Sequence, residues 1–319
     1  MITKIKLDFT IPEQLAGERL DRALAKQLPQ YSRSRLKQWL TSGQLTIDGA
    51  SPPPKYKIAG GEQVSIRADL EENNKWEAQA IDLDIIFEDE SLLVINKPID
   101  FVVHPGAGNS HNTLANALLH YHPPLAKLPR SGIVHRIDKD TTGLLVVAKT
   151  LEAQTNLIKQ LQEKRIKRQY EAIVNGHPTG GGTINAPIGR HPKQRTKMAV
   201  VENGKMAITH YRIIEHLPHH TRLKVRLETG RTHQIRVHLA HIGYPIVGDQ
   251  SYGGRLKLPK NITPEVSQIL RQFKRQALHA RWLELKHPIN HEQLKFEAPL
   301  PDDIKTLLNQ LGKDSDIKK

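Results

Sequence analysis

The sequence predicts an α+β fold in two parts, a small N-terminal unit and a larger domain built on a mixed, mostly antiparallel sheet flanked by helices. The chain has 319 residues, of which 38% are hydrophobic, so it is long enough for two domains with packed cores. Beyond residue 80, strand patterns are frequent but do not alternate regularly with helical ones. The absence of a glycine-rich phosphate loop also argues against a doubly wound nucleotide-binding fold.

The first part, residues 1–68, is predicted to contain two helices followed by two short strands. The first helix begins near Glu18, and leucines at four-residue spacing form its apolar stripe: Leu20, Leu24 and Leu28. Ser32 is placed to cap the second helix, on which Leu36, Trp39 and Leu40 share one face. The strands are predicted at residues 45–47 and 63–66.

Charge is distributed unevenly along the chain. Lys and Arg number 47 against 33 Asp and Glu, which gives a net charge of +14. The excess lies in residues 1–68 and 91–319, whereas residues 69–90 are acidic, and residues 69–80 are predicted to be an acidic linker. Two basic blocks suit a polyanionic partner such as nucleic acid, although solubility alone is an alternative explanation.

The larger domain is predicted to span residues 81–311, and residues 312–319 are predicted to form a flexible tail. Its strands are expected at residues 92–95, 144–147, 171–174, 209–214, 222–227 and 280–285. Helical patterns occur at residues 113–121, 151–164, 233–242 and 264–274.

Composition narrows the possible chemistry and location. The chain has no cysteine, which excludes a disulfide framework, a thiolate zinc site and a cysteine nucleophile. Among its 17 histidines, His233 and His238 are five residues apart and would point apart on a helix, so no metal site is expected. The N-terminus lacks a signal-peptide core, and no apolar run approaches the ~18 residues of a membrane span. We therefore expect a soluble, cytoplasmic protein without a membrane partner.

The densest polar cluster lies in residues 132–150. His135, Arg136, Asp138 and Asp140 occupy a loop that leads directly into the apolar strand at residues 144–147. Polar side chains at the end of a buried strand are typical of a functional site, although a loop capped by its own carboxylates is an alternative. In an extended segment the two aspartates would face opposite ways, so a carboxylate pair sharing a proton is not expected.

Several motifs carry a family resemblance. His135-Arg136-Ile137-Asp138 followed by Thr141-Thr142-Gly143 resembles the His-Arg-Leu-Asp…Thr-Ser-Gly motif of the RluA family of RNA pseudouridine synthases, with two conservative departures. Further family motifs follow in the expected order across residues 80–300: Asn96-Lys97-Pro98, Lys167-Arg-Gln-Tyr170, Glu228-Thr-Gly-Arg-Thr-His-Gln-Ile-Arg-Val-His238 and Gly248-Asp249. Residues 17–66 resemble the S4 RNA-binding domain, whose outer face would carry Arg19, Arg22, Arg33, Arg35 and Lys37.

The resemblance implies an isomerase that needs no metal, nucleotide or redox cofactor. Asp138 would be the nucleophile, Arg236 its charged partner, and Tyr170 the ring that stacks on the uracil and helps to remove the C5 proton. Arg136 would fill the space left by the flipped-out base, because a paired base must be extruded to be reached. The remaining expected RNA contacts of this domain are Arg231 and His135. We expect His135 mainly to order the loop that carries Asp138.

The family also suggests a partner. The resemblance implies 23S rRNA or a pre-50S subunit as substrate, with the stem-loop of helix 69 as the expected site. Nothing in the sequence demands more than a monomer, which is the oligomeric state we expect. Three alternatives remain: action on another rRNA or tRNA site, a carboxylate-using hydrolase with a second catalytic carboxylate, and a non-catalytic ribosome-assembly factor. The sequence does not determine which uridines are modified, or whether C6 or C1′ is attacked.

Overall fold

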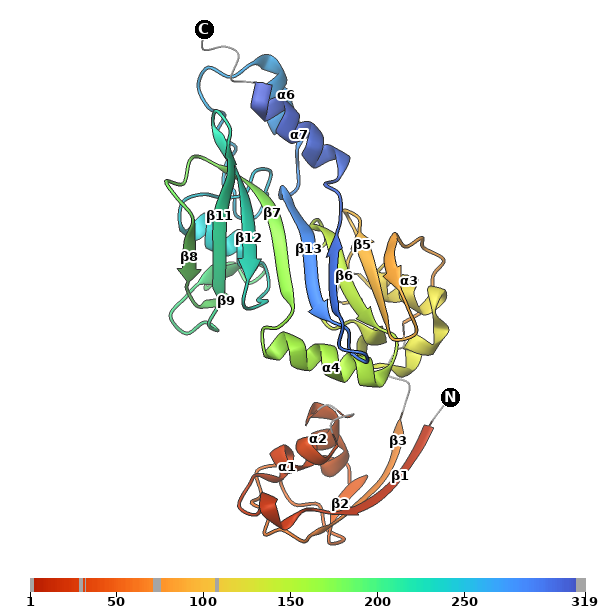
Figure 1. Ribbon diagram of the computed structural model, residues 1–319. Coiled ribbons are helices and arrows are strands. Elements are labelled where there is room, and N and C mark those ends of the chain that lie inside the picture. The colour runs from red at the N-terminus through yellow and green to blue at the C-terminus, as the bar shows by residue number, and fades with distance from the viewer. Residues whose placement is uncertain (1–2, 29–30, 32, 71–75, 107–108, 314–319) are drawn as a thin grey trace. The chain divides into compact units, whose positions relative to one another are not determined.

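The computed structural model describes residues 3–28, 31, 33–70, 76–106 and 109–313, and the chain divides into two compact units. The first comprises Met1–Glu77 and Pro124–Ser131, and the second comprises Ala78–Pro123 and Gly132–Lys319. Figure 1 shows the helices and strands of both units.

The first unit contains a three-stranded antiparallel sheet and two helices, α1 (Leu20–Gln27) and α2 (Arg33–Thr41). The strands, in the order β1-β3-β2, are β1 (Thr3–Thr10), β3 (Gln63–Leu70) and β2 (Leu45–Ile47). The predicted apolar stripes are buried in its core together with residues of the sheet: Leu20, Leu24, Leu28, Leu36, Trp39, Leu40, Leu45 and Ile66. Strand β1 was not predicted, and Ser32 lies outside the described residues.

A nine-stranded sheet forms the second unit, and every pairing in it is antiparallel except that of β6 with β13. The strand order is β4-β5-β6-β13-β7-β12-β11-β8, and β14 pairs with β13. The bounds are β4 (Ile85–Glu88), β5 (Leu92–Lys97), β6 (Thr142–Ala148), β7 (Lys167–Asn175), β8 (Gly182–Asn185), β11 (Ile208–His216), β12 (His220–Leu227), β13 (Leu278–Lys286) and β14 (Gln293–Glu297). The predicted mixed, mostly antiparallel sheet is confirmed. A separate two-stranded ribbon joins β9 (Ile188–Arg190) to β10 (Met198–Val200).

The four predicted helices of this unit are present, together with one that was not predicted. They are α3 (Leu114–Tyr121), α4 (Leu151–Gln162), α5 (Gln234–His241) and α6 (Pro264–Gln272), and the additional helix is α7 (Asp302–Lys313). The described residues of the two units also contain short 3₁₀ segments, at Glu13–Leu15, Pro123–Lys127 and Pro129–Gly132. No helix within the described ranges is long and apolar enough to cross a bilayer.

The structure shifts two predicted boundaries. Strand β3 continues to Leu70, so the first two residues of the predicted linker pair in a sheet. Helix α7 includes Gly312 and Lys313, which the sequence had placed in the tail. The helix continues that far because Ile304, Leu307 and Leu311 are buried on one face and anchor its whole length. Residues 71–75 and 314–319 lie outside the described part of the chain.

The backbones of Gly143 in β6 and Ala280 in β13 approach each other closely, just after the loop that carries Asp138. β6 is buried along its whole length, and Figure 1 shows it beside β13. At Gly143, φ is +110°, and a Cβ placed there would lie 2.3 Å from the carbonyl oxygen of Ala280. Only glycine allows this approach, so the glycine of the Thr-Thr-Gly motif sets where the loop before β6 leaves the sheet.

Candidate active site

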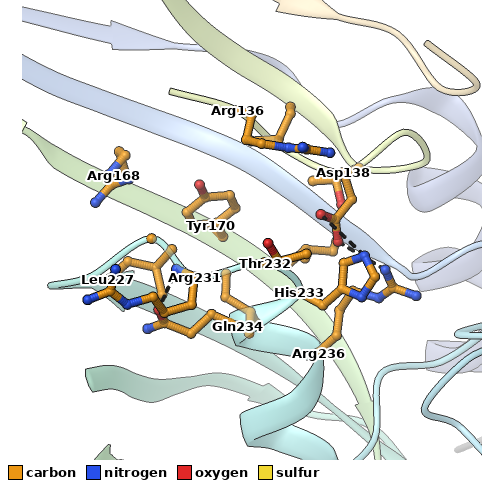
Figure 2. A pocket seen from close by; sticks show the side chains of 15 residues that line it. Arg136, Asp138, Arg168, Tyr170, Leu227, Arg231, Thr232, His233, Gln234 and Arg236 are labelled. Atoms are coloured by element: carbon orange, nitrogen blue, oxygen red, sulfur yellow. Dashed lines mark hydrogen bonds and ion pairs between the residues drawn. The ribbon is translucent and has the colours of Figure 1, made fainter. Parts of the chain in front are cut away.

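A pocket in the second unit collects residues from β7, the loop before β6, and the segment from the end of β12 into α5. Its lining residues are Arg136, Ile137, Asp138, Thr141, Arg168, Tyr170, Leu227, Gly230, Arg231, Thr232, His233, Gln234, Ile235, Arg236 and Leu278 (Figure 2). The set includes five residues predicted from the sequence, from segments far apart in the chain: Arg136, Asp138, Tyr170, Arg231 and Arg236. The fold therefore brings the predicted residues to one place.

Asp138 is held in a turn rather than in an extended segment. Its carbonyl oxygen accepts a hydrogen bond from the backbone N–H of Thr141 at 3.0 Å, and residues 139 and 140 form the turn. Below the turn, the ammonium of the fully buried Lys97 donates to the carbonyl oxygen of Lys139 at 2.7 Å. The prediction that Asp138 and Asp140 face opposite ways assumed an extended segment between them, and the chain instead turns at residues 139 and 140.

Arg236 links two carboxylates. Its Nη1 donates to Asp138 Oδ2 at 3.0 Å, while its Nε and Nη2 donate to the two oxygens of Asp249 at 2.7 and 2.9 Å. Burial alone would raise the pKa of Asp249, but the hydrogen bonds and charge of Arg236 outweigh it and hold that pKa below its ordinary value. Arg236 is thus fixed by one ionised carboxylate and presents its remaining edge to Asp138.

His233 faces the other oxygen of Asp138. Its Nε2 lies 4.0 Å from Asp138 Oδ1, and its Nδ1 lies 2.7 Å from the hydroxyl of Tyr252. That hydroxyl accepts a hydrogen bond from the backbone N–H of Met198 at 2.9 Å, so its own hydrogen is available for Nδ1. Burial lowers the pKa of His233, which favours the neutral ring, and a hydrogen bond from the Tyr252 hydroxyl to Nδ1 would leave the ring proton on Nε2, toward Asp138.

The backbone of His233 is itself unusual. It has φ 56° and ψ 21°, the left-handed conformation, at the residue that precedes helix α5. A side chain other than glycine rarely adopts this conformation, and it is commonly retained where a site requires it. Here the conformation directs the imidazole into the pocket at the start of the helix that carries Arg236.

Tyr170 forms the middle of the pocket. It lies on β7 and is 5% exposed, and Figure 2 shows it between Arg168 on one side and Asp138 on the other. Burial raises the pKa of its phenol above the ordinary value, so the hydroxyl keeps its proton at neutral pH. The ring is suited to stacking on a base, whereas a phenolate that removes a proton is disfavoured.

His135 is turned away from RNA binding. Its Nε2 accepts the backbone N–H of Val146 at 3.2 Å, and burial lowers its pKa to about 3. A neutral ring in this position adds no positive charge for phosphate, so we retain only the predicted role of ordering the loop. Arg136, by contrast, is exposed beside Asp138.

The predicted cations of the first unit occupy α1, α2 and the residue before α1. Arg19 and Arg33 both bind the carboxylate of Asp21, at 3.0 and 2.7 Å. Arg35 lies over the ring of Trp39, 6.0 Å from its centroid. The other two cations of the set, Arg22 and Lys37, are exposed on the same helices.

Sequence reasoning missed four residues of the site: Arg168, His233, Asp249 and Tyr252. His233 stood inside the Glu228–His238 motif but was weighed individually only as a metal ligand. The described residues contain no group of three or more His, Cys, Asp or Glu side chains placed to hold a metal ion. Asp249 and Arg168 lie in the family motifs Gly248-Asp249 and Lys167–Tyr170, so their positions in these motifs could have indicated that they belong to the site. No sequence signal pointed to Tyr252, because its role depends on its contact with His233, 19 residues away along the chain.

Comparisons with known proteins identify the family. The family model described as RNA pseudouridylate synthase matches residues 91–241. The chain is 54% identical to the ribosomal large subunit pseudouridine synthase D of Salmonella typhimurium, covering 100% of this chain and 98% of that one. It is 50% identical to the protein of the same name from Vibrio cholerae, covering 100% and 99%.

Two solved human structures are also similar. RNA Pseudouridylate Synthase Domain Containing 4 matches with a TM-score of 0.56 and 25% identity, covering 71% of this chain and 92% of that one. RNA Pseudouridylate Synthase Domain Containing 1 matches with a TM-score of 0.54 and 27% identity, covering 70% and 85%. With its sheet, its pocket and these relatives in agreement, the chain belongs to the RluA-type family of RNA pseudouridine synthases, which are isomerases.

Proposed function

We propose that the protein converts uridine to pseudouridine in large-subunit (23S) rRNA, with Asp138 as the nucleophile and without a cofactor. The observation that carries the proposal is the pairing of Asp138 with Arg236 at 3.0 Å inside a pocket that also contains Tyr170. The choice of RNA rests on the relatives, which are named ribosomal large subunit pseudouridine synthase D and match along nearly their whole length. Helix 69 is our proposed site within that RNA.

The reaction rearranges bonds without adding or removing atoms overall. The bond between uracil N1 and ribose C1′ breaks, the base turns, and C5 joins C1′, while C5 loses a proton and N1 gains one. A carboxylate suits this sequence because it can add to C6 or C1′ and then leave again. Arg236 places a positive charge 3.0 Å from the carboxylate that makes this attack.

Asp249 supports the same step through its two hydrogen bonds with Arg236. When Asp138 forms a covalent ester, it loses the negative charge that pairs with Arg236. A buried guanidinium left without a partner is costly, but Arg236 keeps its two bonds to Asp249. The positive charge is therefore compensated before, during and after the covalent step, and Asp138 remains able to leave.

Access to the uridine requires base flipping. A base inside a stem is out of reach, and extruding it costs a few kcal/mol. We assign the filling of the vacated space to Arg136, which is exposed next to Asp138, and the stacking of the flipped uracil to Tyr170. In both assignments a planar side-chain group, the guanidinium of Arg136 or the ring of Tyr170, stacks on the π-face of a base.

We further propose that the first unit is an S4-like RNA-binding domain. Its two helices carry Arg22 and Lys37 exposed, where they are available to phosphates. We propose a monomer that acts in the cytoplasm on 23S rRNA or an assembling pre-50S subunit. The net charge of +14 supports a polyanionic partner.

Tritium release tests the proposal. The purified protein and Asp138→Asn are incubated with a 23S rRNA transcript carrying uridine tritiated at C5, with no metal or nucleotide added. Release by the wild type alone is expected. Liberation of free uracil would favour a hydrolase, release only from a tRNA transcript would replace the substrate, and inertness toward both RNAs would leave an assembly factor as the better account.

A further inference from the structure

Arg168 has no partner in the described part of the protein. It lies on β7 two residues before Tyr170, so both side chains face the pocket. Its Nε is buried without a hydrogen-bond partner, and no carboxylate of the described residues pairs with its guanidinium. Arg168 is half-buried, and a cation whose buried Nε has no acceptor is costly, so the fold retains here a charge that the described residues do not neutralise.

The fold leaves space for this guanidinium. Gly230 follows β12 in the loop of the Glu228–His238 motif, and a Cβ placed on it would lie 2.9 Å from Arg168 Nη1. No positive φ accounts for a glycine at this position. The absence of a side chain at Gly230 therefore leaves room for the guanidinium of Arg168, which lies next to this glycine.

The pocket has two chemically different ends. Figure 2 shows Asp138, His233 and Arg236 on one side of Tyr170, and Arg168 and Arg231 on the other. Asp138 is the only carboxylate among the lining residues, and Arg236 already pairs with it. The end that holds Arg168 therefore has positive charge and no acidic side chain of the pocket lining to balance it.

We propose that Arg168 binds a phosphate oxygen of the RNA backbone beside the flipped uridine and so positions the nucleotide over Tyr170. The inference rests on the proposed RNA-modifying function and adds a subsite to it. A phosphate is favoured over a uracil carbonyl because a full negative charge offsets the unpaired guanidinium, and the planar fork of arginine fits two phosphate oxygens. With the base on Tyr170, the reacting ribose faces Asp138 at the opposite end.

Single-turnover kinetics on the tritiated 23S transcript test the subsite. We expect Arg168→Met to raise the half-saturating protein concentration about 10- to 100-fold, the range of one charge-assisted hydrogen bond, with a smaller effect on the maximal rate. The slope of log affinity against log salt should fall by about 0.7 to 0.9, the contribution of one phosphate. Arg168→Lys should recover part of the affinity, because it keeps the charge without the fork.

Two further variants separate position from charge. Gly230→Ala keeps all charges but displaces the end of a flexible side chain, so it should weaken binding in the same direction as Arg168→Met. Arg226→Met is the matched control: it removes an arginine from β12 opposite Gln169, on the other face of the sheet, and should leave half-saturation near the wild-type value. The thermal midpoint of Arg168→Met should stay at or above the wild-type value, because no internal hydrogen bond of the Arg168 Nε is lost.

The outcomes are distinguishable. Equal half-saturation and equal salt slopes for wild type and Arg168→Met would overturn the subsite, as would an equal loss in Arg226→Met. Weaker binding with an unchanged salt slope would point to a uracil contact and also reject the phosphate. The same slopes can be read from filter binding to the transcript, so a wild type that binds but releases no tritium would count against the proposed substrate only.

Discussion

The hydroxyl of Tyr252 lies 2.7 Å from Nδ1 of His233 and fixes the imidazole with Nε2 toward Asp138. Tyr252 in turn receives the backbone N–H of Met198, so the chain of contacts begins in the β9–β10 ribbon and ends at the proposed nucleophile. A carboxylate that must attack and then leave benefits from fixed neighbours on both of its oxygens. Here Arg236 holds one oxygen and the His233 ring faces the other.

Tyr252→Phe removes the bond that sets the ring orientation of His233. We expect the maximal rate of tritium release to fall about 5- to 10-fold, equivalent to one hydrogen bond, with little change in half-saturation. Tyr244→Phe is the control, because Tyr244 lies outside the pocket lining and its ring packs beside Gly176. A loss of affinity with an unchanged maximal rate would show that Tyr252 serves RNA binding instead.

Asp249→Asn removes the charge that compensates Arg236. Because Asp249 is buried and binds Arg236 through both oxygens, we expect a loss of about 3 kcal/mol or more in the free energy of unfolding. Activity should fall with it, since Arg236 would then bind Asp138 more tightly and oppose its attack. Denaturant titration measures the stability, with the exposed Asp302→Asn as control. A stable, active variant would contradict the role given to Asp249.

Gly143→Ala forces two backbones apart. The new Cβ would lie 2.3 Å from the carbonyl oxygen of Ala280 at a φ of +110°, so strain and displacement should cost about 3 kcal/mol or more. The loop that carries Asp138 should move as well, reducing activity beyond the loss of folded protein. Gly180→Ala is the control, because nothing lies within 4 Å of its Cβ and its φ is not positive. A thermal midpoint equal to that of Gly180→Ala would disprove the close packing.

The loss of folding stability at acidic pH should depend on His135. Burial lowers its pKa to about 3 in the folded protein, whereas in the unfolded chain it titrates near its ordinary value of 6.5. Between these values the unfolded state binds more protons, so this contribution to stability is lost as the pH falls from about 6.5 toward 3. The thermal midpoint of His135→Gln should therefore fall less steeply with pH than that of the wild type. The exposed His241→Gln should keep the wild-type slope, and identical slopes for all three would refute the assignment.

Much of the fold was predictable because the relevant signals are local. The stripe of Leu20, Leu24 and Leu28 and the apolar run at residues 144–147 each determine an element through its own periodicity, and both are found where predicted. Helix α7 and strand β1 also carry local patterns, which were overlooked rather than absent. The pairing of β6 with β13 could not be read from either strand, since it depends on which backbone approaches Gly143.

The sequence by itself determined the family, the two-part α+β organisation and the residues that carry the expected chemistry, because motif order and hydrophobic periodicity are written along the chain. Only the tertiary structure decided the partners of those residues: Asp249 behind Arg236, Tyr252 behind His233, and the unpaired guanidinium of Arg168 over Gly230. These relationships join side chains from separate strands, loops and helices. Hydrogen bonds and burial act through space, so spacing along the chain does not reveal them.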